Sequence, residues 1–311
     1  MSDMSRQGLP PAAVARIERA RASGVRTSLL AVPAQAGLDA IGLTVVGEVM
    51  GCLVEHIGWQ GYAGCGWVGG VGTGPFSGPY GGGIGSGYAS GYGGRFETMV
   101  AAPGSNYGFA PYVDALDAGW RGAIGRMLAE CAALGGDGVV GVRLSERHLD
   151  AGNREFLALG TAVRARDGGH LRRPFATTLD GQDVAKLLHS QWVPAGIVVA
   201  LTVGIRHDDY QTRQATFLGA GNVEVPGFTD LVGHTRDGVR QLLSRRCAEA
   251  GADGAILTTP MWLSVHELEV AEGHTDHAAE AGVVATLVCH FGRRGTAPAR
   301  SPALTILPLR G

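Results

Sequence analysis

The chain has almost no lysine and little net charge. Lys186 is the only lysine beside 25 arginines among its 311 residues. A phosphate-binding loop that ends in Gly-Lys is therefore absent, and a lysine Schiff base could form only at Lys186. The formal charge of −2 and the pI near 6.5 provide no basic surface for nucleic acid or for an anionic membrane, so neither partner is expected.

The sequence also lacks paired cysteines and a long apolar run. The five cysteines are scattered and include no Cys-x-x-Cys pair, which argues against a disulfide framework or a zinc knuckle and predicts a cytoplasmic protein. A Gly-x-Ser-x-Gly nucleophile motif is missing, and Cys52 and Cys65 lie in no motif that would lower a thiol pKa. The longest apolar stretch, 193–205, ends at Arg206 and is shorter than the roughly 20 residues needed to cross a bilayer.

The most informative pattern that is present is an octapeptide that occurs twice. Cys131-Ala-Ala-Leu-Gly-Gly-Asp-Gly138 recurs as Cys247-Ala-Glu-Ala-Gly-Ala-Asp-Gly254. Each copy ends an amphipathic helix pattern and is followed by an apolar strand pattern. A second echo, of residues 45–51 in residues 198–204, comes in the same order. The sequence therefore predicts a tandem duplication and an α+β fold with about two domains.

Helix and strand patterns divide the chain into four parts. Helices are expected over about 113–134 and about 230–250, each with one apolar stripe and a glycine at its end. Strands are expected to open the two domains at 27–32 and 175–179. The predicted parts are a leader helix within 1–26, a first domain at 27–166, a second domain at 175–291 and a C-terminal tail at 292–311.

A glycine-rich insertion interrupts the first domain at residues 61–94. It holds 16 glycines in 34 residues, interleaved with aromatic side chains. Such a segment does not repay its ordering entropy by its own packing, which predicts a flexible loop; the alternative is a flap over a pore or a protein partner. The Gly-x-Gly-x-x-Gly match at 64–69 lacks a strand–turn–helix context and predicts no nucleotide site. The tail is a second segment that could dock on a neighbouring subunit.

The motifs of both domains resemble the YbjQ-like family, small proteins labelled as heavy-metal-binding domains. Glu48 and the segment 160–163 belong to the resemblance in the first domain, and their counterparts in the second are expected at Leu201 and at 282–285. The full set of matching motifs is Thr27-Ser28, Gly47-Glu48-Val-Met-Gly51, Ala133-Leu-Gly-Gly-Asp-Gly-Val-Val-Gly-Val142, Gly160-Thr-Ala-Val163, Ala176-Thr-Thr-Leu179 and Ala250-Gly-Ala-Asp-Gly254.

The resemblance implies a fold and an assembly. Each YbjQ-like domain would be an α+β unit with an antiparallel sheet packed on a long helix, and copies would form a ring, commonly a pentamer. Five chains with two domains each would then build a two-tiered ring. We therefore predict a non-enzymatic, ring-forming homo-oligomer that acts as a structural or binding protein without a cofactor.

The alternative is a heavy-metal-binding or sequestering protein that uses His/Asp segments. His274, Asp276 and His277 form one candidate set, and His207 and Asp209 another, for Zn²⁺, Cu²⁺ or Ni²⁺. Against this, the polar, glycine-containing segment 269–280 predicts an exposed loop, and 207–209 follow an apolar run as a turn does. A His-Glu-x-x-His motif fails because residue 270 is valine.

Isolated reactive side chains have plainer explanations. Glu48 could be an acid with a raised pKa in an enzymatic cleft, a ligand at a subunit interface, or a strand side chain that faces solvent, the commonest case. Cys131 and Cys247 lie on the apolar stripes of their helices and are expected to be buried packing residues. Asp137 and Asp253 are expected to serve the tight helix-to-strand turns.

Overall fold

A computed structural model describes residues 9–58, 104, 106–150, 152–169, 171–217, 221–271 and 274–291, with the backbone alone for 269–271 and 274–275. The insertion 61–94 and the tail 292–311 lie outside these residues. The elements are α1 (Pro11–Ser23), α2 (Val32–Ala40), β1 (Leu43–His56), β2 (Asn106–Tyr107), α3 (Ala110–Ala133), β3 (Gly138–His148), β4 (Asn153–Ala165), β5 (Phe175–Ala176), α4 (Gly181–His189), β6 (Trp192–His207), α5 (Tyr210–Thr216), α6 (Pro226–Glu249), β7 (Gly254–Leu257), β8 (Trp262–Ala271) and β9 (His274–His290).

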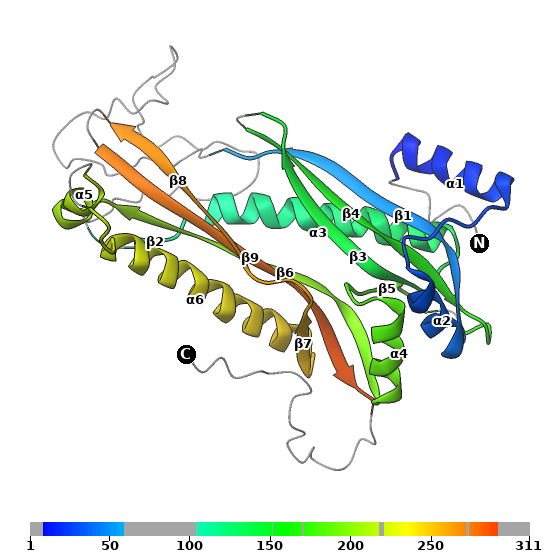
Figure 1. Ribbon diagram of the computed structural model, residues 1–311. Helices are drawn as coiled ribbons and strands as arrows, with labels where there is room; N and C mark the ends of the chain where they lie inside the picture. The colour runs from blue at the N-terminus through cyan, green and yellow to red at the C-terminus, as the bar shows by residue number, and fades with distance from the viewer. Residues whose placement is uncertain are drawn as a thin grey trace.

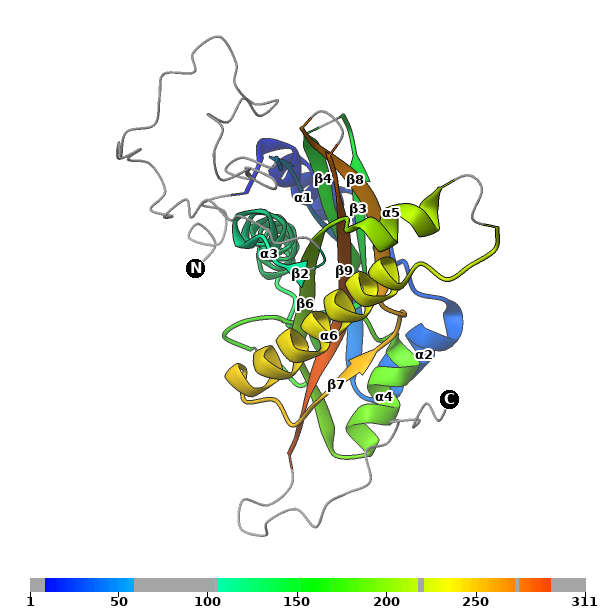
Figure 2. The same ribbon diagram turned by 90° about the vertical axis from the view of Figure 1, so that its left-hand side faces the viewer.

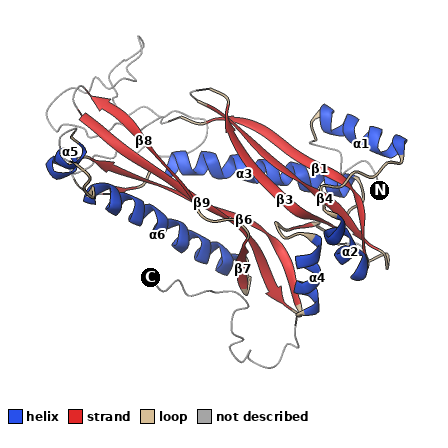
Figure 3. Cartoon of the chain, in the orientation of Figure 1, coloured by secondary structure: helices blue, strands red, loops and turns tan. Residues whose placement is uncertain are grey.

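The strands form two sheets, and the fold is α+β as predicted (Figure 1, Figure 3). Sheet A has the order β1-β4-β3-β5, and sheet B has the order β2-β6-β9-β7 with β8 also paired to β9. All pairings are antiparallel except that of β3 with β5, which is parallel. We call the part of the chain from α1 to β4 the first half and the part from β5 to β9 the second half. Each half contributes one short strand to the sheet of the other: β2 of the first half joins sheet B, and β5 of the second half joins sheet A.

Helix α3 packs on sheet A through its predicted apolar stripe. Leu116, Trp120 and Met127 are buried on this face, and the rings of Trp120 and Phe156 meet edge to face at 5.1 Å. A Cβ on Gly51 would lie 1.9 Å from the Ala123 carbonyl oxygen, so only glycine lets β1 approach the helix this closely. The tight contact fixes α3 against the sheet.

Sheet B is covered on both faces. On one face Val239 of α6 packs with Ala281 and Val283 of β9. On the other face Leu201 and Ile205 of β6 join the core around α3 and sheet A. Figure 2 shows β6 and β9 between α3 and α6. No helix in the described part of the chain combines the length and the apolar character needed to cross a membrane.

The repeated octapeptide forms the same turn in both halves. Gly135 and Gly251 adopt φ values of 77° and 64°, the left-handed region that glycine enters at little cost. The amide of Asp137 donates to Val163 at 2.8 Å, and that of Asp253 donates to Val288 at 3.0 Å.

The aspartate side chains complete these turns. The Asp137 carboxylate accepts the Ala165 amide at 2.9 Å, and the Asp253 carboxylate accepts the His290 amide at 2.8 Å. The predicted turn role of both aspartates is confirmed.

The second sequence echo was aligned in the wrong register. With Val163 and Val288 as equivalent positions, Thr161 corresponds to Thr286; Glu48 pairs with Thr161, and Ile197 pairs with Thr286. The counterpart of Glu48 is therefore Ile197 and not Leu201. The counterpart of 160–163 is likewise 285–288 and not 282–285. In apolar strands many short segments look alike, whereas cross-strand pairing fixes one register.

Two further expectations about local structure were wrong. Residues 27–31 are not a strand: the chain runs irregularly to Val32, where α2 begins with Pro33 in its first turn. Residues 269–271 and 274–280 are not an exposed loop, because they belong to the paired strands β8 and β9, and Asp276 and His277 are buried. The polar residues suggested a loop, but burial beside ionic partners allows them in a strand.

Candidate functional site

Most of the predicted metal-ligating residues meet at one end of sheet B. His207 ends β6 and pairs across the sheet with Asp276 near the start of β9. The His207 ring nitrogen Nδ1 lies 2.6 Å from the Asp276 carboxylate, and the Tyr107 hydroxyl donates to the same carboxylate at 3.2 Å. This first His/Asp pair is buried on the face of sheet B that contacts α3.

A second His/Asp pair lies on the opposite face. His277 Nδ1 is 3.0 Å from the Asp208 carboxylate, and its Nε2 is 3.6 Å from Glu267 of β8. The Phe228 ring of α6 lies 4.5 Å from the imidazole, centre to centre. The hydrogen bond that the His277 ring donates to the Asp208 carboxylate raises the pKa of His277 above its ordinary value. The charged imidazolium is thus favoured at this position.

The remaining predicted ligands have other roles or lie elsewhere. Asp209 caps α5, since its carboxylate accepts the Thr212 amide at 2.8 Å and pairs with Arg206 at 3.0 Å. These contacts, led by the Thr212 hydrogen bonds, hold the pKa of Asp209 below its usual range. His274 is the first residue of β9, paired through its backbone with Ala271.

The arrangement does not fit a metal centre. Asp276 and His277 are consecutive residues of a strand, so their side chains point to opposite faces and one ion does not reach both. Each imidazole already contacts a carboxylate through Nδ1. No group of three or more His, Cys, Asp or Glu that could hold a metal occurs among the residues whose side chains are described.

We expect calorimetric titration with Zn²⁺, Cu²⁺ and Ni²⁺ to give the same heats for wild type and for His277→Gln. The reason is that a metal must displace a proton that the Asp208 carboxylate favours on this imidazole, and the residues whose side chains are described form no group of three that could hold an ion. His189→Ala, at the exposed end of α4, is the control for heat from a surface histidine. A stoichiometric heat that His277→Gln or His274→Ala abolishes, and His189→Ala retains, would contradict this expectation.

Glu48 lies on β1, the edge strand of sheet A, and is exposed to solvent. Its negative charge helps to raise the pKa of Arg16 of α1, after the larger effect of the hydrogen bond from Arg16 to Glu130. Arg16 is bound to Glu130 of α3, a buried carboxylate that also accepts the Met50 amide at 2.8 Å. Glu130 and Arg16 thus cover the open edge of β1 and fasten α1 to the first half, while Glu48 faces solvent beside them.

A buried ionic cluster between the halves was not predicted from the sequence. Arg154 of β4 pairs with Glu280 of β9 at 3.2 Å and with Glu146 of β3 at 2.7 Å. The Tyr112 hydroxyl donates to Glu280 at 2.9 Å and is bonded to Arg154 as well. Burial, followed by the charge of Glu280, raises the pKa of Tyr112 above its ordinary value. A signal was available: Arg154 and Glu280 are charged residues that border apolar strand segments.

The cysteines of the repeated octapeptide differ in burial. Cys131 is fully buried, and burial raises the pKa of its thiol to about 12. Cys247 is only half-buried, and burial still raises its pKa above the ordinary value. The predicted packing role is confirmed for Cys131, and the full burial expected of Cys247 was wrong.

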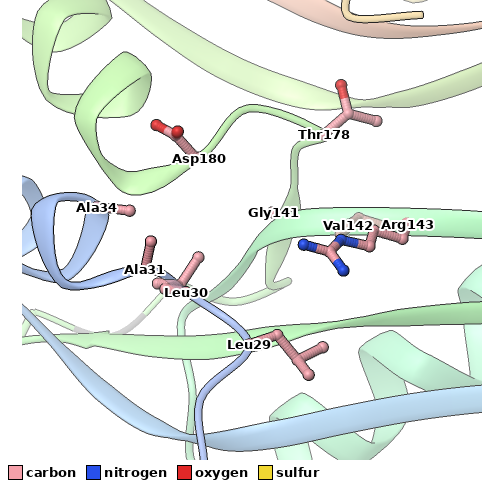
Figure 4. A pocket seen from close by; sticks show the side chains of 9 residues that line it. All are labelled: Leu29, Leu30, Ala31, Ala34, Gly141, Val142, Arg143, Thr178 and Asp180. Atoms are coloured by element: carbon pink, nitrogen blue, oxygen red, sulfur yellow. The ribbon is translucent and has the colours of Figure 1, made fainter.

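A small cavity of about 210 Å³ lies where the two halves meet (Figure 4). Its walls are residues 29–31 with Ala34 before and within α2, residues 141–143 of β3, and Thr178 with Asp180 before α4. The leading segments of both halves therefore lie against the same stretch of β3. The cavity is a seam between the halves, and its polar side chains are only those of Arg143, Thr178 and Asp180.

Comparison with known proteins supports the family resemblance for part of the chain. Residues 103–166 match the family model YbjQ_1, described as "Putative heavy-metal-binding". The matched segment contains β2, α3, β3 and β4. The resemblance is confirmed there, and the second copy stays a prediction.

A curated relative has a name that points to an assembly. The chain is 40% identical over 141 residues to "Encapsulin nanocompartment protein Rv1762c" of Mycobacterium tuberculosis, an alignment that covers 43% of this chain and 52% of that protein. The chain thus spans about half the length of this relative. No solved structure matches the chain.

Proposed function

We propose, from the YbjQ-like segment at residues 103–166, that the chain is a cytoplasmic, non-enzymatic structural protein that assembles with copies of itself into a ring. The observation that carries this proposal is the 40% identity to a protein named for a nanocompartment, since a compartment is built from many protein subunits. The number of five chains per ring follows from the family resemblance.

The polar clusters support a structural role. The side chains of His207, His277 and Arg154 are buried and each contacts a carboxylate of the same chain. A catalytic residue needs a reacting atom within reach of its functional group. These groups instead join strands to strands and one half to the other, as expected of a rigid building block.

We expect light scattering coupled to gel filtration to give a mass about five times the 32.1 kDa of one chain. Assemblies that stack several such five-chain rings would give multiples of this value. A single species at the mass of one chain at micromolar concentration would contradict the proposed function. Measurement at several salt concentrations serves as the control. We expect the mass to stay the same, because subunit contacts made by backbone hydrogen bonds and apolar burial respond weakly to ionic strength.

A further inference from the structure

The second half of the chain completes the sheet of the first half. β5 pairs in parallel with the start of β3, with Phe175 opposite Gly138 and Ala176 opposite Val139. The Thr177 amide donates to the Val139 carbonyl at 2.9 Å, and the Gly141 amide donates to the Leu179 carbonyl at 2.8 Å. The leading segment of one half thus serves as the edge strand of the other.

The first half has a leading segment with the same local hydrogen bonds. The Leu30 amide donates to Ser28, as the Leu179 amide donates to Thr177, both at 3.1 Å. One residue earlier, the Leu29 amide donates to Thr161 at 3.1 Å, and that of Thr178 donates to the equivalent Thr286 at 2.9 Å. Residues 25–29 are therefore the counterpart of residues 174–178.

β5 covers the outer edge of β3, and the corresponding edge in the second half is that of β7. β7 begins after Asp253 as β3 begins after Asp137, and it is the last strand of sheet B. Within the described part of the chain nothing pairs with the outer edge of β7. Accordingly Gly138 of β3 is buried, whereas Gly254 is half-buried and Leu257 is 48% exposed.

The outer edge of β7 and residues 25–29, the two surfaces that correspond to the paired β3 and β5, are both open in the single chain. A Cβ on Gly138 would meet the Phe175 ring at 2.1 Å, but one on Gly254 would meet only Val288, at 3.5 Å. Residues 25–27 are exposed, and Val25 is 65% exposed, while Ala176 is buried. In Figure 1, β7 lies at the margin of sheet B, and residues 25–29 lie between α1 and α2.

The contact between the halves is of the kind that can be repeated. Helices α2 and α4 pack against each other where the halves meet. The middle of α2 takes part, since a Cβ on Gly37 would lie 2.9 Å from Gln182. The first turn of α4 takes part, since a Cβ on Gly181 would lie 2.0 Å from the Ala34 carbonyl oxygen. Different positions of the two helices meet, so the contact is heterologous and not two-fold. A heterologous contact leaves one unused surface at each end and builds rings or filaments.

We propose that β7 of one chain accepts residues 25–29 of a second copy as a parallel edge strand, with Ala255 opposite Thr27. The partner is a second copy because the chain itself carries both surfaces and shows their pairing once already. This inference rests on the proposed function and names the surface that would carry it. Exposed strand edges are natural sites for such strand addition.

The pairing would give each chain two successive positions around one ring. A closed ring then contains an even number of halves, in place of the two stacked tiers expected from the sequence. In the proposed contact between chains, α4 of one chain would meet α2 of the next. Lys186 would take the place that Gly37 has in the observed contact, and Val32 the place of Gly181, so the two helices would lie farther apart than they do within one chain. Val32 is 83% exposed in the single chain. Strand pairing, and not close helix packing, would therefore hold successive chains.

Disulfide trapping between two different single variants tests the pairing. Thr27→Cys and Ala255→Cys proteins are mixed and mildly oxidised, and mass spectrometry searches for the peptide that joins positions 27 and 255. We expect a covalent dimer in the mixture, and a ladder of multimers when one chain carries both changes, since paired strands bring the two Cβ atoms within disulfide range. Ser264→Cys, exposed on neighbouring β8, replaces Ala255→Cys in the control and should give no such peptide.

A second variant distinguishes a failure of the β7 surface from a failure of the proposed function. Ala255 is equivalent to Val139, whose carbonyl accepts from Thr177 and so faces β5. Ala255→Pro should therefore remove an amide that points away from β9 and leave the β7–β9 pairing in place, while the incoming strand loses a hydrogen bond. We expect a smaller assembly mass with an unchanged circular dichroism spectrum. Oligomeric wild type without the joined peptide, and with a mass that Ala255→Pro leaves unchanged, would overturn this surface alone; monomeric wild type would overturn the proposed function. A joined peptide that appears only after removal of residues 292–311 would assign β7 to the tail and also overturn the proposal.

Discussion

Replacing Arg154 with methionine is expected to lower the free energy of unfolding by about 3 to 5 kcal/mol, the cost of leaving a buried carboxylate without its cation. Arg154 is 8% exposed and binds Glu280 and Glu146, while Glu280 is 6% exposed. After the substitution Glu280 would keep the hydrogen bond from the Tyr112 hydroxyl but lose its cation. Urea unfolding followed by circular dichroism measures the loss.

The matched control for this prediction is Arg147→Met. Arg147 lies on β3 in the same sheet but is exposed, so the change should cost less than about 0.5 kcal/mol. Adding Glu280→Gln to Arg154→Met should restore part of the stability, because the uncompensated charge disappears. Equal losses for Arg154→Met and Arg147→Met would show that the cluster does not join the halves.

Replacing Gly51 with alanine is expected to lower the free energy of unfolding by about 3 kcal/mol, the upper part of the usual range for overpacking. The new Cβ would lie 1.9 Å from the Ala123 carbonyl oxygen and 2.6 Å from the Met127 amide nitrogen. Both atoms belong to the backbone of α3, so relief requires the whole helix to move away from β1. Thermal unfolding of the two proteins at the same concentration measures the effect.

The matched control here is Gly47→Ala on the same strand. A Cβ on Gly47 would meet only the end of the Leu134 side chain, at 4.0 Å, so this change should cost about 1 kcal/mol or less. The second half carries Ala200 at the position equivalent to Gly51, where α6 leaves room for it. Similar losses for the two alanine variants would contradict the close approach of α3.

Much of the local structure could be predicted because it is encoded within a few residues. The apolar stripe of α3, the glycine that ends it and the aspartate turn that follows all lie within one stretch of sequence. The same holds for α6 and the turn before β7. The leading segment before α2 was missed as a helix start, since its strand-like residues outweighed Pro33.

The candidate site was predicted in part. His207, Asp276 and His277 do gather at one end of sheet B, although the sequence offered them as two separate sets. The strand alternation that turns Asp276 and His277 to opposite faces follows only once the segment is known to be a strand. Arg154 and Glu280, which lie 126 residues apart, were not connected at all.

The sequence by itself determined the α+β class, the two long amphipathic helices, the identical turns that end them, and a family resemblance that extends through residues 103–166. The tertiary structure alone decided the register between the halves, the ionic cluster around Arg154 and the side-by-side contact of β3 with β5. The physical reason is range: periodicity and turn chemistry act over a few neighbouring residues, whereas register and charge pairing depend on which distant strands pack together.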